Sequence, residues 1–95
     1  MASSKEFKDY IIDQLRSLTG ISVRPMMGEF ILYYNGVVFG GIYDDRLLVK
    51  ETKTNAKYKL TKELPYKGGK MMLMVENLDN KDYLETLIKD TCAGL

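Results

Sequence analysis

The chain of 95 residues contains no histidine. Histidine is the usual general base near neutral pH and the commonest metal-ligating side chain. Its absence argues against most hydrolytic triads and zinc sites, and no carboxylate pair or lysine stands at a recognisable catalytic spacing. We therefore expect a protein that is not an enzyme and that uses neither a metal ion nor a cofactor.

Cysteine and long apolar runs are also scarce. The single cysteine, Cys92, cannot form an internal disulfide, which agrees with a reducing compartment. No apolar stretch approaches the roughly 20 residues that cross a bilayer. The opening MASSKEF lacks the basic start and apolar centre of a signal peptide. These features predict a cytoplasmic protein that has no membrane partner.

The composition is that of a folded protein. Apolar residues make up 45% of the chain and charged residues 28%, which is too hydrophobic for a disordered segment. The length allows one hydrophobic core but not two. We expect one domain over residues 1–95.

Helical periodicity marks both ends of the chain. Ser3 and Glu6 form a capping-box pattern that begins a first helix, and Gly20 follows as its end. A closing helix is predicted over residues 79–92, with Cys92 as a buried, inert thiol. The apolar residues on one side of each helix are Phe7, Ile11, Leu15 and Leu18 in the first, and Leu84, Leu87, Ile88 and Cys92 in the second.

The middle of the chain predicts an antiparallel meander. Asn35 and Gly36 stand between two β-rich runs and indicate a two-residue hairpin turn, and Asp44 with Asp45 offers a weaker second turn. Gly40 and Gly41, adjacent within a strand, suggest a bulge or a close approach by another backbone. Tight turns give a register in which Tyr34 is opposite Val37, Leu32 opposite Phe39, and Ile42 opposite Leu47.

Both faces of this sheet are expected to be apolar. One carries Phe30, Leu32, Tyr34, Val37, Phe39, Tyr43 and Leu48, and the other Ile31, Tyr33, Val38, Ile42, Leu47 and Val49. A sheet with one face in water should alternate apolar with polar residues. Helices should therefore cover one face, and either a partner chain or a second helix layer of the same chain should cover the other.

A short helix is predicted over residues 54–60, followed by a loop through Pro65 and the adjacent Gly68 and Gly69, and a further strand within MMLMVEN. Strands and helices occur in separate runs. This order favours an α+β domain with an antiparallel sheet of about five strands and flanking helices.

Residues 50–70 form a basic segment with seven lysines and two glutamates. With Tyr58 and Tyr66 interleaved, it could form a groove for phosphates and bases. A solvated surface is the favoured interpretation, because the segment has no arginine for bidentate recognition and no nucleic-acid-binding motif. The candidate nucleic-acid contacts are Lys53, Lys57, Lys59, Lys62, Lys67 and Lys70.

The segment SVRPMMGEF, residues 22–30, enters the meander. Pro25 indicates an edge strand or a crossing between two strands, and Gly28 allows the positive φ of a sharp turn. Arg24 is either pinned by Asp44 or Asp45 or exposed for a partner. The methionines Met26, Met27, Met71, Met72 and Met74 are expected to fill the core, with an adaptable protein-binding surface as the alternative and a soft-metal site as a weaker one.

The stretches RPMMGEF, YNGVVFGGIYDDRLLVK and LPYKGGKMMLMVEN resemble the N-terminal domain of the TfoX/Sxy family, which is named for regulators of natural competence. The resemblance covers nearly the whole chain. It departs where Met27 stands, since the family usually has an aromatic residue there. It implies a fold like that of type III secretion chaperones, in the order α-β(3)-α-β(2)-α.

The resemblance implies a protein-interaction module in transcriptional regulation, of the kind that acts on DNA-uptake genes beside another regulator. Its partners would be transcription factors or polymerase subunits, and a homodimer is a further expectation. Direct nucleic-acid binding through the basic segment is the alternative. The candidate partner-binding residues are Arg24, Pro25, Met26, Met27, Gly28, Asp45 and Arg46.

Overall fold

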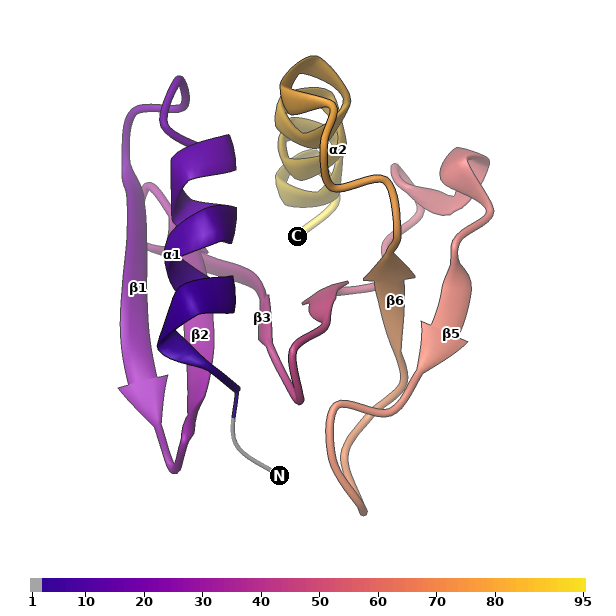
Figure 1. Cartoon of the computed structure of the whole chain (residues 1–95). Helices are drawn as coiled ribbons and strands as arrows, with labels where there is room; N and C mark the ends of the chain where they lie inside the picture. The colour runs from indigo at the N-terminus through magenta and orange to yellow at the C-terminus, as the bar shows by residue number, and fades with distance from the viewer. Residues whose placement is uncertain (1–2) are drawn as a thin grey trace.

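A computed structural model of the protein describes residues 3–95. The elements follow one another as α1, β1 to β4, a single 3-10 turn η1, β5, β6 and α2 (Figure 1). No helix in the described part of the chain is long and apolar enough to span a membrane. The bounds are α1 Lys5–Gln14, β1 Ile21–Met26, β2 Glu29–Tyr34, β3 Val37–Ile42, β4 Leu47–Val49, η1 Ala56–Tyr58, β5 Thr61–Glu63, β6 Met72–Val75 and α2 Lys81–Ala93.

The strands form a six-stranded antiparallel sheet in the order β1-β2-β3-β4-β6-β5. The α+β fold is confirmed, and β1 is an edge strand, as Pro25 indicated. The sixth strand is β5, which occupies a segment that the sequence predicted as loop. The helix predicted over residues 54–60 is only the turn η1. The buried Asn55 side chain binds the backbone of Lys50 and Thr52 instead, and Lys59 adopts a left-handed conformation.

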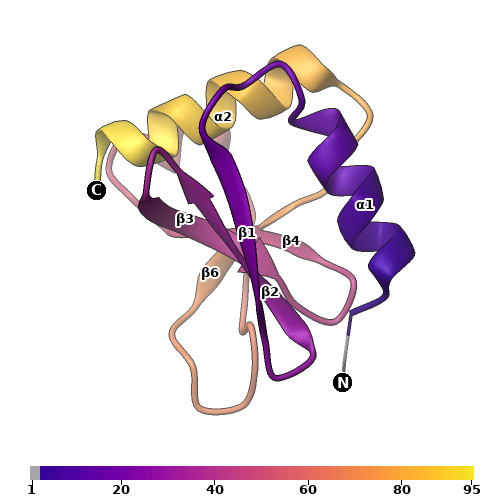
Figure 2. The same cartoon turned by 90° about the vertical axis from the view of Figure 1, so that its left-hand side faces the viewer.

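Both helices pack on the same face of the sheet. Figure 2 shows α2 running across the sheet, with α1 beside the β1–β2 hairpin. The prediction that helices cover one face is therefore confirmed. A second helix layer of the same chain is absent from residues 3–95, so that alternative is wrong for the described structure. The core contains Ile11, Leu15, Leu18, Leu32, Phe39, Ile42, Leu47, Val49, Leu73, Val75, Leu84, Leu87 and Ile88.

The helix ends differ in detail from the predictions. Ser4 caps α1 by accepting the Phe7 N–H at 3.1 Å, because the hydroxyl of Ser3, the predicted cap, is bound to Glu29. The helix ends at Gln14, well before Gly20, although Leu18 still reaches the core. Helix α2 is capped by Asn80 and buries the three predicted aliphatic residues, while Cys92 is half-buried.

The first predicted hairpin turn is confirmed, with φ of 51° at Asn35 and 81° at Gly36. The Tyr34–Val37 and Ile42–Leu47 pairings are confirmed as well. The Leu32–Phe39 pairing is wrong, because Leu32 pairs with Gly40 and Phe39 is the extra residue of a β-bulge. The bulge therefore lies next to Gly40, and the predicted close approach is confirmed at both glycines, since a Cβ on Gly40 would overlap the carbonyl oxygen of Leu48 and one on Gly41 that of Phe30.

The bulge changes which residues share a face. Beyond it the alternation along β3 reverses, so that Phe39 and Ile42 both lie in the core, whereas the uninterrupted pattern placed them on opposite faces. Leu48 is also moved from its predicted face. It pairs with Gly41 in the same cross-strand row as Ile31, on the side of the sheet that the helices leave uncovered.

Candidate functional site

The sheet face opposite the helices is apolar, and no helix within residues 3–95 lies over it. Pairing places Arg24, Ile31, Gly41, Leu48 and Met74 in one row across five strands. This row alternates with the core residues, so it belongs to the second face. Leu48 is fully buried there although it lies outside the main core. The β5–β6 loop and two turns, described next, partly cover this face.

Three connections between strands lie at the same end of the sheet, the lower end in Figure 1. They are the β1–β2 turn at Met27 and Gly28, the β3–β4 turn at Asp44 and Asp45, and the β5–β6 loop over residues 64–71. The paired aspartates confirm the second predicted turn, because both have positive φ, 53° and 55°, and the flanking residues exchange two backbone hydrogen bonds.

The start of the described chain ties two of these turns together. The Ser3 hydroxyl donates to Glu29 at 2.6 Å and accepts the Asp45 N–H at 3.0 Å. The Glu29 carboxylate also accepts the Asp44 N–H, and Asp45 accepts the Ser4 N–H at 2.7 Å. Asp45 is thus occupied within the chain and positions the turns. It does not pin Arg24, which is exposed and has no ion pair within residues 3–95.

Arg46 fixes the third turn. Its guanidinium donates to the Glu63 carboxylate at 3.1 Å, to the Leu64 carbonyl at 3.0 Å and to the Tyr43 carbonyl at 3.1 Å. These bonds fasten the start of the β5–β6 loop to the β3–β4 turn. Asp45 and Arg46, both predicted as partner contacts, therefore hold the surrounding loops in place through bonds inside the chain.

Two tyrosines beside these loops line two neighbouring cavities. The rings of Tyr43 and Tyr66 lie 6.1 Å apart at 53°. Both tyrosines line a cavity of about 370 Å³ and a second one of about 530 Å³. We call the two together the tyrosine groove. Its smaller lobe is lined by Met26, Met27 and Glu29, and its larger lobe by Val38, Gly40, Lys50, Glu51, Pro65, Lys70, Met71, Met72 and Leu95.

Several large apolar side chains of the groove face solvent. Met27 is 97% exposed, Tyr66 56%, Met71 47% and Met26 37%. None of the five methionines expected in the core is buried, so that prediction is wrong and the alternative of a protein-binding surface gains support. Contiguous exposed apolar residues mark interaction sites, and methionine suits surfaces that must adapt to a partner.

The larger lobe of the groove carries unpaired positive charge. Lys50 and Lys70 line the larger lobe, and neither has an ion pair within the described residues. Glu51, which also lines it, is paired with Lys62 at 3.2 Å. Tyrosine is neutral at physiological pH, and burial, with Tyr66 and Glu29 nearby, raises the pKa of Tyr43 further.

The six lysines predicted to contact nucleic acid differ in their ion pairs and in their surroundings. Lys57 is paired with Asp90 of α2 at 3.2 Å and Lys62 with Glu51, so two of the six candidate charges are matched within the chain. Lys70 lines the tyrosine groove. Lys53, Lys59 and Lys67 are exposed.

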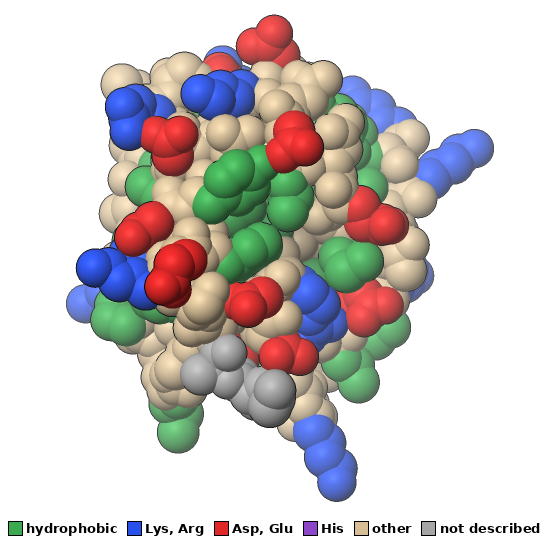
Figure 3. Space-filling model, in the orientation of Figure 1, with side chains coloured by type: hydrophobic (Ala, Val, Ile, Leu, Met, Phe, Trp, Pro, Cys, Tyr) green, Lys and Arg blue, Asp and Glu red, His purple; other side chains and the backbone are tan. Residues whose placement is uncertain are grey.

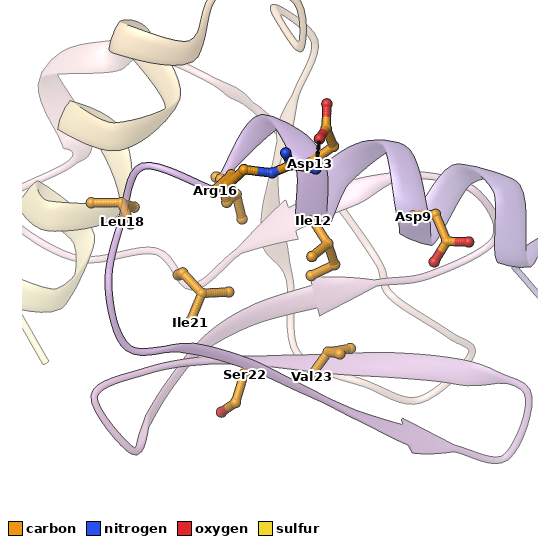
Figure 4. Close-up of a pocket in the computed structure, with 9 residues that line it drawn as sticks. Asp9, Ile12, Asp13, Arg16, Leu18, Ile21, Ser22 and Val23 are labelled. Carbon is orange, nitrogen blue, oxygen red and sulfur yellow. Dashed lines mark ion pairs between the residues drawn. The ribbon is translucent and has the colours of Figure 1, made fainter.

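A second cleft, of about 310 Å³, lies between α1 and β1. Ile12, Ile21 and Val23 point into it, and the Asp13–Arg16 ion pair stands at its rim (Figure 4). The cleft contains no nucleophile beside a base. On the helix-bearing face, charged side chains of both signs surround a central hydrophobic group (Figure 3). In the part of the chain that the structure describes, no three carboxylate or cysteine side chains converge to hold a metal ion.

Sequence reasoning recognised some members of the groove and missed others. The methionine set and the segment around Pro25 pointed toward it. The role of Lys50 and the pairing of Tyr43 with Tyr66 were missed, because residues far apart in sequence meet only through the sheet order.

Comparison with known proteins places the chain in a family. The model of the TfoX N-terminal domain matches residues 13–92. The chain belongs to the TfoX N-terminal domain family. The matched range includes all six strands, most of α2 and every residue that lines the groove except Leu95. The family is a regulatory type of domain related to natural competence.

A curated relative is an uncharacterized 12.7 kDa protein in the trpE 5′ region of Spirochaeta aurantia. It is 26% identical to this chain, and the alignment covers all of this chain and 85% of the relative. Its description assigns no activity that could be compared with the groove.

Proposed function

We propose that this TfoX N-terminal domain is a non-enzymatic protein-interaction module in transcriptional regulation, with the tyrosine groove as its contact surface. One observation carries the proposal. The sheet face that the helices leave uncovered bears the exposed methionines and Tyr66. Tyrosine and methionine are enriched at protein interfaces, and tyrosine is among the residues that dominate binding energy there.

The candidate residues take different roles in this proposal. Met26 and Met27 supply apolar contact area at the mouth of the groove, and Arg24 supplies a charge on the same face of β1. Pro25 and Gly28 shape the edge strand and its turn. Asp45 and Arg46 act as positioning residues, since their polar atoms bind the chain itself.

The test is site-specific photo-crosslinking. Benzoylphenylalanine, an analogue of tyrosine, replaces Tyr66 in the groove or, as the matched control, Tyr10, an exposed tyrosine on α1. The protein is irradiated in host lysate with and without nuclease, and the adducts are identified by mass spectrometry. We expect adducts with transcription factors or polymerase subunits from Tyr66 that survive nuclease and that Tyr10 does not give. The same adducts from both positions, or none from either, would reject the groove as the contact surface.

The same experiment addresses nucleic-acid binding, the alternative function. That reading predicts adducts that disappear with nuclease. It also predicts an affinity for DNA or RNA that falls steeply with salt, by about 0.9 in the log–log slope for each phosphate neutralised. Formation of a homodimer, which the sequence also predicted, would give an adduct of twice the chain mass.

A further inference from the structure

We propose that the tyrosine groove binds a short acidic and apolar peptide segment of a partner protein, in which leucine-like side chains are interspersed with carboxylates. The inference rests on the proposed function and specifies the chemistry of the partner.

The apolar half of this chemistry follows from the lining of the two lobes. Both lobes are lined by the tyrosine pair and by methionines, which are Met26 and Met27 in the smaller lobe and include Met71 in the larger. Burial raises the pKa of Tyr43 above the ordinary value of a phenol, so its hydroxyl adds no charge to the groove. Aliphatic or aromatic side chains of a partner would gain by leaving water in both lobes.

The acidic half follows from charge complementarity. In the larger lobe the acidic side chain, Glu51, is paired with Lys62. Glu29, which lines the smaller lobe, accepts hydrogen bonds from the Ser3 hydroxyl and the Asp44 N–H but has no ion pair within residues 3–95. Lys50 and Lys70 line the larger lobe without an ion pair within residues 3–95. A peptide segment that fills the larger lobe therefore meets uncompensated positive charge and is favoured if it carries carboxylates there.

The backbone of Met27 supports a role in binding. Met27 has a φ of 51°, in the left-handed region where side chains other than asparagine, aspartate and glycine are strained. The other two-residue turns of this sheet place Asn35 and Asp44 at the equivalent position. With 97% of its surface exposed, Met27 gains no packing within the described chain that would offset the strain. A contact with a partner would account for methionine at this position.

The test uses synthetic peptides and the methyl resonances of the methionines. Two acidic probes contain leucine and glutamate, one with leucine at alternate positions for an extended chain and one with leucine at helical spacing. Two basic probes have lysine in place of glutamate. Each is titrated into protein that carries carbon-13 in its methionine methyl groups. We expect at least one acidic probe to shift the methyl signals of Met26, Met27 and Met71, and the basic probes to leave them in place.

Charge variants identify the lysines responsible. Lys50→Glu with Lys70→Glu reverses the charges of the groove. The matched control, Lys53→Glu with Lys59→Glu, changes the net charge equally within the same segment, at exposed residues that do not line the groove. Because exposed ion pairs contribute modestly, we expect the groove reversal to weaken binding of the acidic probe about tenfold, and the control reversal to change it less than about twofold. Methyl spectra without peptide show that both variants are folded.

Each other outcome overturns the proposal. Equal binding of acidic and basic probes would show that charge complementarity does not select the peptide. An equal effect of the two double variants would show that binding depends on the net charge of the protein and not on the lysines of the groove. Methyl shifts that depend on protein concentration alone would make a second copy of the chain the occupant. If no probe binds but Tyr66 still crosslinks a protein, the partner chemistry is wrong while the proposed function survives. If both experiments fail, the proposed function falls as well.

Discussion

Replacing Met27 by asparagine should make the protein more stable and a weaker binder. Met27 occupies the first central position of a two-residue hairpin turn with a φ of 51°. The left-handed conformation costs an ordinary side chain about 1–2 kcal/mol, and asparagine tolerates it better. Because the side chain is 97% exposed, its replacement loses almost no buried area. We expect Met27→Asn to stabilise the domain by about 0.5–1 kcal/mol, part of the left-handed penalty.

Thermal unfolding followed by circular dichroism measures this change. For a domain of this size, 1 kcal/mol corresponds to roughly 4–8 °C in Tm, so the expected rise is about 2–8 °C. The matched control is the reverse change, Asn35→Met, in the β2–β3 turn, where φ is also 51°. It should lower Tm. The acidic probe should bind Met27→Asn more weakly although the fold is more stable. A fall in Tm for Met27→Asn would refute the strain argument, since it would mean that methionine stabilises the turn.

Three further predictions concern the scaffold. Asn55→Ala should destabilise the domain by about 2–3 kcal/mol in urea unfolding, because the fully buried amide accepts the Thr52 N–H and donates to the Lys50 carbonyl and the Thr91 hydroxyl, and its removal leaves these groups without a partner. Gly40→Ala should cost at least about 1–3 kcal/mol in the same assay, since its Cβ would overlap the Leu48 carbonyl oxygen, and a variant of unchanged stability would contradict that approach. Burial and the hydrogen bond to Asp90 raise the pKa of Tyr58 from 10.0 to about 12. The folded state resists ionisation of this group, so the wild type should lose stability between pH 10 and about 12. Tyr58→Phe should flatten the stability–pH curve there, and an unchanged slope would contradict the assignment.

Local patterns in the sequence were sufficient for most elements of the fold. The apolar spacing of both helices placed Ile11 and Leu84 in the core, and Asn35 with Gly36 specified a turn whose conformation few other residues adopt. Pro25 marked the edge strand because it cannot donate a ladder hydrogen bond. These features depend on a few neighbouring residues, so they can be predicted from the chain alone.

The bulge at Phe39 and the strand β5 could not be predicted in this way. A bulge changes the register by one residue and moves every later side chain of β3 to the other face, and the adjacent glycines suggested a bulge without fixing its position. Strand β5 has little apolar character of its own and forms because β6 offers it a paired edge. Both depend on which backbone lies alongside, which is a property of the assembled sheet.

The sequence by itself therefore determined the fold class, the two helices, the hairpin turns and the family. Only the tertiary structure decided where the methionines lie and what they surround. Methionine packs equally well in a core and on a binding surface, so its presence in the sequence does not distinguish the two. The sheet order places Met26 and Met71 beside the tyrosine pair on the helix-free side, and it brings the ring centroids of Tyr43 and Tyr66 to 6.1 Å from each other. The tyrosine groove exists because three turns from distant parts of the chain lie at the same end of the sheet.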